Sequence, residues 1–156
     1  MEERKRFYIN SPKKLVIAVF EKYGLSYEKS ADVANVMLEA DRMGIESHGV
    51  SRIGMYVQGM KIGRIHPKAE ITLVKETPVS AVLDANDGMG QPVGIKAMNM
   101  AIEKAKSVGM AMVVVRNSNH FGIGGYYTMM AGRAGLMGMC MTNSEAMVVP
   151  TFGRRA

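Results

Sequence analysis

The sequence predicts an α/β protein in which leading helices are followed by a mixed sheet flanked by helices. Three observations support this class: helical spacing of apolar residues over residues 11–61, short alternating runs over 70–83, and helical stretches separated by apolar runs over 90–141. We therefore expect residues 1–66 to form a helical amino-terminal segment and residues 67–156 to begin an α/β domain. With 156 residues, 47% of them hydrophobic, the chain has the size of one ordinary domain.

Two helices are predicted first. Ser11-Pro12 gives an N-cap followed by a proline at the first helical position, and Gly24 ends the helix. Either Ser26 or Ser30 caps the second helix, which runs toward Gly44. The apolar stripes of the two helices are Leu15, Val16, Val19 and Phe20 in the first, and Val33, Val36, Met37 and Ala40 in the second.

A third helix is expected from about Val50 to Lys61, before the pattern changes to strands. Glu70–Val74 alternates and Val79–Leu83 is a second short run, so both predict strands. Asn86-Asp87-Gly88 is a turn signal, and the spacing predicts a long helix over Gly90–Ser107.

The last predicted elements surround a polar loop. Met110–Val115 is continuously apolar, which is typical of a strand buried on both faces. The loop Arg116–Gly122 follows, then a helix over Gly124–Arg133 and a second buried strand over Leu136–Met141. This order of strand, helix, strand, helix and strand indicates a partly parallel sheet.

Composition narrows the range of functions. The net charge is +6, but the basic residues are dispersed rather than gathered in a stripe, which argues against a nucleic-acid-binding protein. The remaining interpretation of the charge is that it attracts small anions such as carboxylates or a dinucleotide. Cys140 is the only cysteine, so no internal disulfide can form; with no signal peptide, this predicts a cytoplasmic protein. No apolar run approaches the roughly 20 residues of a membrane span.

The histidines are the first candidates for chemistry, because histidine titrates near neutral pH. His120 lies in the loop after the apolar run that ends at Val115, and ligands of α/β sheets bind beyond the carboxyl ends of strands. His48 and Arg52 lie at the start of the third helix, where they form either a carboxylate-binding corner or a capped helix start with a surface ion pair. His66, before a proline, is expected to be structural.

Several familiar motifs are missing or imperfect. No HxxxH or CxxC spacing predicts zinc, and neither a GxSxG elbow nor a phosphate-binding P-loop is present. Residues 88–94 stand where a dinucleotide fingerprint would, but the third glycine falls one residue late and Pro92 interrupts. We interpret this stretch as a turn and a helix start.

Three segments of the chain form a recognisable set. They are Asp41–Arg52; Asn117–Gly122 with Gly125-Tyr126-Tyr127; and Met141–Ser144 with Val149-Pro150 and Gly153-Arg154. Together they resemble signatures of the malate/L-lactate dehydrogenase family, which is distinct from the Rossmann-type lactate and malate dehydrogenases. The three segments occur in the family's order, and the similarity covers essentially the whole chain. The family also includes L-sulfolactate, ureidoglycolate and diketogulonate dehydrogenases.

The resemblance implies hydride transfer between NAD or NADP and C2 of a 2-oxo or 2-hydroxy acid such as malate or lactate. It also implies a non-Rossmann fold, a homodimer, and chains about twice this length, so that this chain stops before most of the cofactor-binding part. An alternative is a catalytically silent module, from a truncated or split gene, that pairs with a separate carboxyl half.

The resemblance also implies roles for individual residues. His120 is expected to be the general acid/base, with His48 as a competitor for that role, and His48 and Arg52 to bind or polarise the substrate. The remaining expected contacts are Ser47 and Asn119 to the substrate, and Thr142, Ser144 and Gly122 to the cofactor; no metal is expected.

Overall fold

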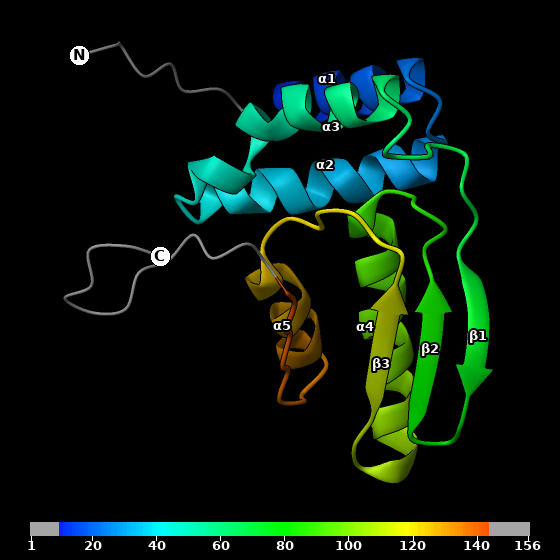
Figure 1. Cartoon of the computed structure of the whole chain (residues 1–156). Coiled ribbons are helices and arrows are strands. Elements are labelled where there is room, and N and C mark those ends of the chain that lie inside the picture. The colour runs from blue at the N-terminus through cyan, green and yellow to red at the C-terminus, as the bar shows by residue number, and fades with distance from the viewer. Residues whose placement is uncertain (1–9, 144–156) are drawn as a thin grey trace, which may run out of the picture.

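The computed structural model describes residues 10–143, and these form a helical layer above a sheet with two further helices (Figure 1). The helical layer holds the first three α-helices and two short 3-10 turns. The sheet is mixed, as the sequence predicts. The elements are α1 (Asn10–Lys22), α2 (Tyr27–Arg42), η1 (Glu46–His48), η2 (Val50–Arg52), α3 (Ile53–Lys61), β1 (Thr72–Glu76), β2 (Ser80–Asp84), α4 (Gly90–Val108), β3 (Met112–Arg116) and α5 (Gly124–Arg133).

The helical layer has its own apolar core. Val16 and Phe20 of α1 and Val33 and Met37 of α2 are buried in it, together with Tyr56 of α3. The predicted stripe of α2 is therefore confirmed. In α1, Leu15 faces solvent and Ile17 is buried instead.

Local signals explain where the helices begin. The Ser26 hydroxyl accepts a hydrogen bond from the Lys29 backbone N–H at 3.3 Å, so Ser26 is the N-cap of α2, while Ser30 is buried inside the helix. The third predicted helix starts as the 3-10 turn η2 and becomes α-helical at Ile53.

A parallel crossover organises the second half. β1 pairs antiparallel with β2, and β2 pairs parallel with β3 after the chain has passed through α4. Leu83, Val93 and Ala97 form the small core between the sheet and α4, and Val113 and Val115 of β3 pack against it. The carboxyl ends of β2 and β3 therefore lie side by side, and they point toward the helical layer (Figure 1).

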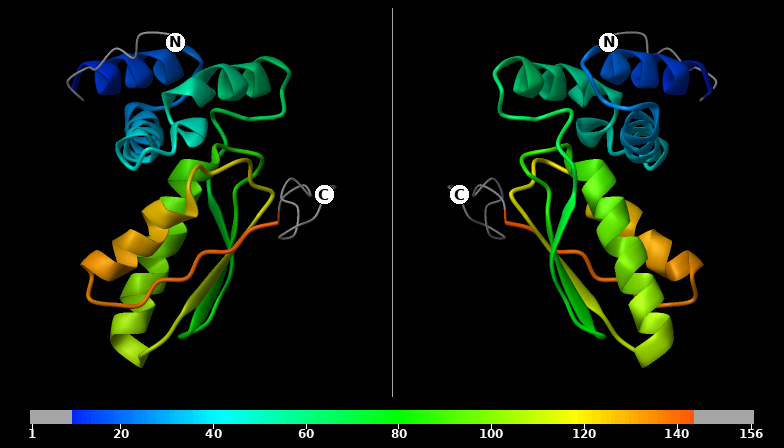
Figure 2. Two further views of the ribbon diagram at one scale, coloured as in Figure 1. Left: turned by 90° about the vertical axis from the view of Figure 1, so that its left-hand side faces the viewer. Right: turned by 90° about the vertical axis from the view of Figure 1, so that its right-hand side faces the viewer.

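The predicted burial of β3 on both faces is wrong for the described residues. Figure 2 shows α4 and α5 on the same side of the sheet, and no helix of the described chain covers the opposite side. Met112 and Val114 point to that uncovered side, and Met112 is 60% exposed. The apolar run correctly predicted a strand, but nothing within residues 10–143 covers its second face.

The predicted buried strand Leu136–Met141 is also wrong for the described residues. The segment has no regular secondary structure and runs from the end of α5 toward the sheet (Figure 2). A Cβ at Gly138 would lie 2.8 Å from the Thr128 carbonyl oxygen, so the missing side chain lets the segment lie against α5. Met137, Met139 and Met141 face solvent.

No helix within residues 10–143 combines the length and the hydropathy that crossing a bilayer requires.

Candidate active site

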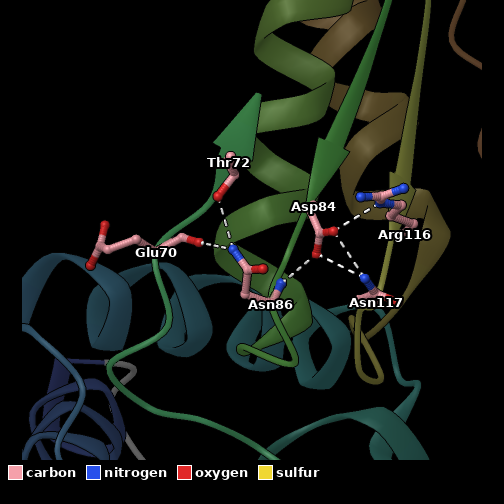
Figure 3. A network of polar contacts seen from close by, with 6 residues as sticks. All are labelled: Glu70, Thr72, Asp84, Asn86, Arg116 and Asn117. Atoms are coloured by element: carbon pink, nitrogen blue, oxygen red, sulfur yellow. Dashed lines mark hydrogen bonds and ion pairs between the residues drawn. The ribbon is translucent and has the colours of Figure 1, made fainter. Parts of the chain in front are cut away.

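Asp84 anchors the loop that follows β3. It stands at the end of β2, and its carboxylate accepts hydrogen bonds from the Arg116 Nε (2.8 Å) and from the Asn117 side-chain amide (2.9 and 3.1 Å; Figure 3). The Asn86 backbone N–H donates a further bond at 2.9 Å. Asp84 thus fixes both the turn before α4 and the start of the loop that carries His120.

Acidification is expected to weaken this anchor. The Asn86 N–H, the Asn117 amide and the Arg116 guanidinium hold the pKa of Asp84 below its ordinary value. The stability that Asp84 contributes is therefore present above the unfolded-state pKa of about 3.9, and it is lost as the pH falls through the lower folded-state pKa. Thermal melts between pH 2 and pH 7 should show that Asp84→Asn lowers the melting temperature at pH 7 and makes its fall with acidification shallower.

The matched control is Glu103→Gln, which removes an exposed carboxylate from the surface of α4. This variant should keep the melting temperature and pH dependence of the wild-type chain. If Asp84→Asn and the wild type showed the same pH dependence, the proposed anchoring role of Asp84 would be wrong.

Asn119 and Gly90 join this loop to the start of α4. The Asn119 side-chain amide donates to the carbonyl oxygens of Asp87 (2.9 Å) and Gly88 (3.1 Å). A Cβ at Gly90 would overlap the Asn119 carbonyl oxygen and lie 2.6 Å from that of His120. The imperfect fingerprint at residues 88–94 is thus a turn and helix start, as predicted, and Gly90 makes room for the chain's own backbone.

His120 is held by two buried polar side chains. Its Nδ1 lies 2.6 Å from the Tyr56 hydroxyl oxygen, and the Gln91 Nε2 donates to that same oxygen at 2.7 Å. Tyr56 and Gln91 are both fully buried. The backbone N–H of Gly122 also donates to Nδ1, at 3.3 Å.

The sequence patterns single out neither Tyr56 nor Gln91. A signal for Tyr56 was available, because it lies four residues after Arg52 and so on a neighbouring position of the same helical surface. Gln91 has no comparable signal, since it lies within the apolar amino-terminal turn of α4.

His48 and Arg52 complete the group from the helical layer. The rings of His48 and His120 are stacked, with centroids 5.3 Å apart and an interplanar angle of 29°. The Ser47 hydroxyl lies 2.9 Å from the His48 Nδ1, and the Arg52 Nε donates to the Ser47 carbonyl at 2.5 Å. The turn itself is fixed by Asp41, whose carboxylate accepts a bond from the Val50 N–H at 3.0 Å.

Electrostatics favour the neutral form of His120. Partial burial lowers the pKa of His120, and the nearby His48 and Arg52 lower it further. Burial raises the pKa of Tyr56 to about 12, so its hydroxyl keeps its proton. A bound anion would offset the Arg52 charge and return the pKa of His120 toward its ordinary value.

The structure brings together some of the predicted site residues and separates others. His48, Arg52, Ser47 and His120 form one half-exposed group. The Asn119 amide nitrogen instead bonds the turn before α4.

Of the residues expected at the cofactor, Gly122 lies beside His120, since its N–H bonds the His120 Nδ1. A Cβ at Gly122 would meet a Val36 side-chain carbon at 2.6 Å, so the absence of a side chain there serves packing on α2. Thr142 is exposed in the segment after α5, and Ser144 lies outside the described residues. His66 is an exposed loop residue whose N–H bonds the Asp87 carbonyl at 2.8 Å.

The sequence of the chain is similar to those of known dehydrogenases. A family model described as malate/L-lactate dehydrogenase matches residues 8–156. The L-sulfolactate dehydrogenase of Methanocaldococcus jannaschii is 45% identical over 142 residues, and the alignment covers 91% of this chain and 41% of that protein. The malate dehydrogenase of Pyrococcus abyssi is 46% identical over 150 residues, covering 94% and 41%.

Solved structures agree with the sequence comparison. The structure of malate dehydrogenase from Pyrococcus horikoshii OT3 superposes with a TM-score of 0.83 at 38% identity, covering 86% of this chain and 39% of that one. The predicted non-Rossmann sulfolactate-dehydrogenase-like fold is thereby confirmed. The chain spans about two fifths of the length of these relatives.

Proposed function

Because the chain belongs to the malate/L-lactate dehydrogenase family, we propose that it supplies the substrate-binding and proton-transfer groups of an enzyme that moves a hydride between NAD or NADP and a 2-oxo or 2-hydroxy acid. The observation that carries this proposal is the convergence of His48, Arg52 and His120 from two distant parts of the chain. In the intact protein, which we take to be a cytoplasmic homodimer, this group forms the acid-binding part of the active site.

Arg52 binds the carboxylate of the substrate. Its Nε–H is bonded to the Ser47 carbonyl and its Nη1 donates to the Met55 Sδ at 3.4 Å, which fixes the plane of the guanidinium. Nη2 and the second N–H of Nη1 remain as donors for a carboxylate. A small acid of the kind named for the relatives, malate or sulfolactate, carries such a carboxylate beside C2.

His120 exchanges the proton. Its Nδ1 faces Tyr56 and Gly122, so Nε2 is the ring nitrogen available to the substrate oxygen at C2. Binding of the acid beside Arg52 raises the pKa of His120, which favours the imidazolium when the substrate is in place. His48, stacked on His120, is the second candidate for this proton transfer.

Thr142 and Ser144 are the residues proposed for the nicotinamide end of the cofactor. The cofactor supplies the hydride or accepts it, and the exposed hydroxyl of Thr142, with Ser144 beyond it, is proposed to approach the nicotinamide. Residues 88–94 do not fit the pyrophosphate, because Gly90 and Gly94 are packed against His120 and Tyr127 of this same chain.

A second candidate function is that of a silent module that pairs with a separate carboxyl half. The uncovered side of the sheet favours it, since Met112 and Val114 there are exposed apolar side chains of a kind that a partner would bury. This candidate uses the same residues and differs only in whether the rest of the enzyme is made separately.

Reconstitution tests the proposal. The chain is mixed with the carboxyl-terminal remainder of the M. jannaschii L-sulfolactate dehydrogenase, and the loss of NADH or NADPH absorbance is followed with a panel of 2-oxo acids. We expect turnover by the mixture and none by either piece alone, because this chain spans only 41% of that relative.

The positive control pairs the same remainder with the relative's own amino-terminal piece. If that pair were active while this chain restored no turnover with any 2-oxo acid, the proposed function would be contradicted. Robust turnover by the chain alone would contradict the expectation that the cofactor site lies mostly elsewhere.

A further inference from the structure

One buried polar atom beside the site has no hydrogen-bond partner among the described residues. It is the side-chain oxygen Oε1 of Gln91, a residue with no exposed surface. Leaving a buried acceptor unpaired costs free energy, so such an atom calls for an explanation. The other end of the same amide, Nε2, donates one hydrogen bond to the Tyr56 hydroxyl at 2.7 Å.

The direction of each bond can be followed from Gln91 to His120. The Gln91 Nε2 can only donate, so the Tyr56 oxygen accepts from it and the Tyr56 proton points to the His120 Nδ1, 2.6 Å away. The Gly122 N–H also donates to Nδ1. With two donors at Nδ1, neutral His120 must carry its proton on Nε2.

That tautomer is unsuited to accept a proton from a hydroxy acid, because the nitrogen that faces the substrate is already protonated. Both working forms of the ring, the imidazolium that gives a proton at Nε2 and the neutral form that takes one there, carry a proton on Nδ1. A proton on Nδ1 requires the Tyr56 oxygen to accept, and the Tyr56 proton then needs another acceptor.

We propose that the side-chain amide of Gln91 reverses to follow the proton on His120, so that Gln91 is a positioning residue that selects between a resting and a working form of the ring. In the resting form, Gln91 donates through Nε2 to Tyr56. In the working form, Oε1 accepts the Tyr56 proton. The proposal rests on the proposed role of His120 in proton transfer.

The two forms balance in protons, but the Gly122 N–H loses Nδ1 as its acceptor in the working form. On protonation, the ring takes one proton from solvent at Nδ1, the Tyr56 hydroxyl turns from Nδ1 to the Gln91 Oε1, and Tyr56 remains a phenol. Each form keeps the same number of bonds between Gln91, Tyr56 and His120. Because the oxygen and nitrogen ends of an amide have nearly the same shape, the side chain occupies nearly the same space in both forms.

Other groups around the ring set the balance between the forms. His48 of η1 and Arg52 of η2 both oppose a positive charge on His120, and the Gly122 N–H, being fixed, opposes a proton on Nδ1. Among the described residues, Tyr127 of α5 is a further titratable group near Tyr56, and burial raises its pKa so that it stays neutral. The resting form is therefore favoured until an anion binds.

The first test is nitrogen-15 NMR of the wild-type chain. Long-range proton–nitrogen spectra should show neutral His120 protonated on Nε2, and the side-chain amide signals of Gln91 should move with the same midpoint as the His120 titration. A neutral ring protonated on Nδ1, or Gln91 signals that ignore the His120 titration, would overturn the proposal. This measurement needs no variant.

Two substitutions at the same position should act in opposite directions. Gln91→Glu presents only acceptors to Tyr56, so it should favour a proton on Nδ1 and raise the imidazolium-to-neutral ratio of His120 at a given pH by about tenfold or more. Gln91→Leu leaves the Tyr56 proton without an acceptor in the working form, so it should lower that ratio by a similar factor. Effects of the same sign would overturn the proposal.

Gln58→Glu is the matched control, since it adds the same charge on the exposed surface of α3. It should leave the His120 titration unchanged. If Gln58→Glu changed the imidazolium-to-neutral ratio of His120 as much as Gln91→Glu does, the effect would be one of added charge alone and the proposal would be overturned. Failure of the enzyme function would instead appear in the reconstitution assay, which is independent of these spectra.

Discussion

Replacing His120 with alanine is expected to lower kcat of the reconstituted enzyme by about 100-fold or more, the scale of a lost general acid/base. The substrate oxygen at C2 would lose its proton partner, while Arg52 would still hold the carboxylate. KM for the 2-oxo acid should therefore change much less than kcat. Steady-state kinetics at several pH values measures both.

Two comparisons decide how that result is interpreted. His66→Ala removes an exposed loop histidine that bonds Asp87 only through its backbone, so it should leave kcat unchanged. His48→Ala tests the competing assignment. If His48→Ala abolished turnover while His120→Ala kept near wild-type kcat, His48 would be the proton-transfer group and the assignment of His120 would be wrong.

Gly90→Ala is the second substitution with a large expected effect. The new Cβ would overlap the Asn119 carbonyl oxygen and press on that of His120 at 2.6 Å, and both obstacles are backbone atoms that cannot rotate away. Overpacking of this kind costs about 1–3 kcal/mol. Because relief requires the loop at His120 to move, we expect a lower melting temperature together with a fall in kcat.

Gly132→Ala provides the matched control for backbone effects. Gly132 lies in α5 with no atom within 4 Å of the position that a Cβ would take. Alanine there should leave the melting temperature unchanged or raise it, since alanine is favoured over glycine in a helix by up to about 1 kcal/mol. If Gly90→Ala were equally harmless, the close approach of α4 to the His120 loop would not be a constraint.

Local signals were enough to predict most elements of the fold. The period of apolar residues gave α1, α2, α4 and α5 within a few residues, and the continuous run before Arg116 gave β3. Burial was predicted less well, because an apolar run does not tell what will cover it. Met112 of β3 and Met139 of the segment after α5 are exposed for that reason.

The site was also predicted only in part, because some of its contacts join residues that are far apart in the sequence. Residue type and position made His48, Arg52 and His120 candidates, the family resemblance selected them, and the structure places them together. The spacing from Arg52 could have drawn attention to Tyr56, but its contact with His120 and that of Gln91 with Tyr56 join residues 64 and 35 positions apart. Only the packed structure shows that their polar atoms meet.

The parallel crossover from β2 through α4 to β3 has a consequence for the order of folding. The helical layer precedes the sheet in the chain and is made before it, but His120 meets His48 only after β3 has paired with β2 across the intervening helix. Such distant pairing forms late, because the chain entropy of closing the loop must be lost first. The nascent chain therefore carries half of its site, His48 and Arg52, in place before the other half exists. The loop at His120 is correspondingly among the first parts expected to open in local unfolding.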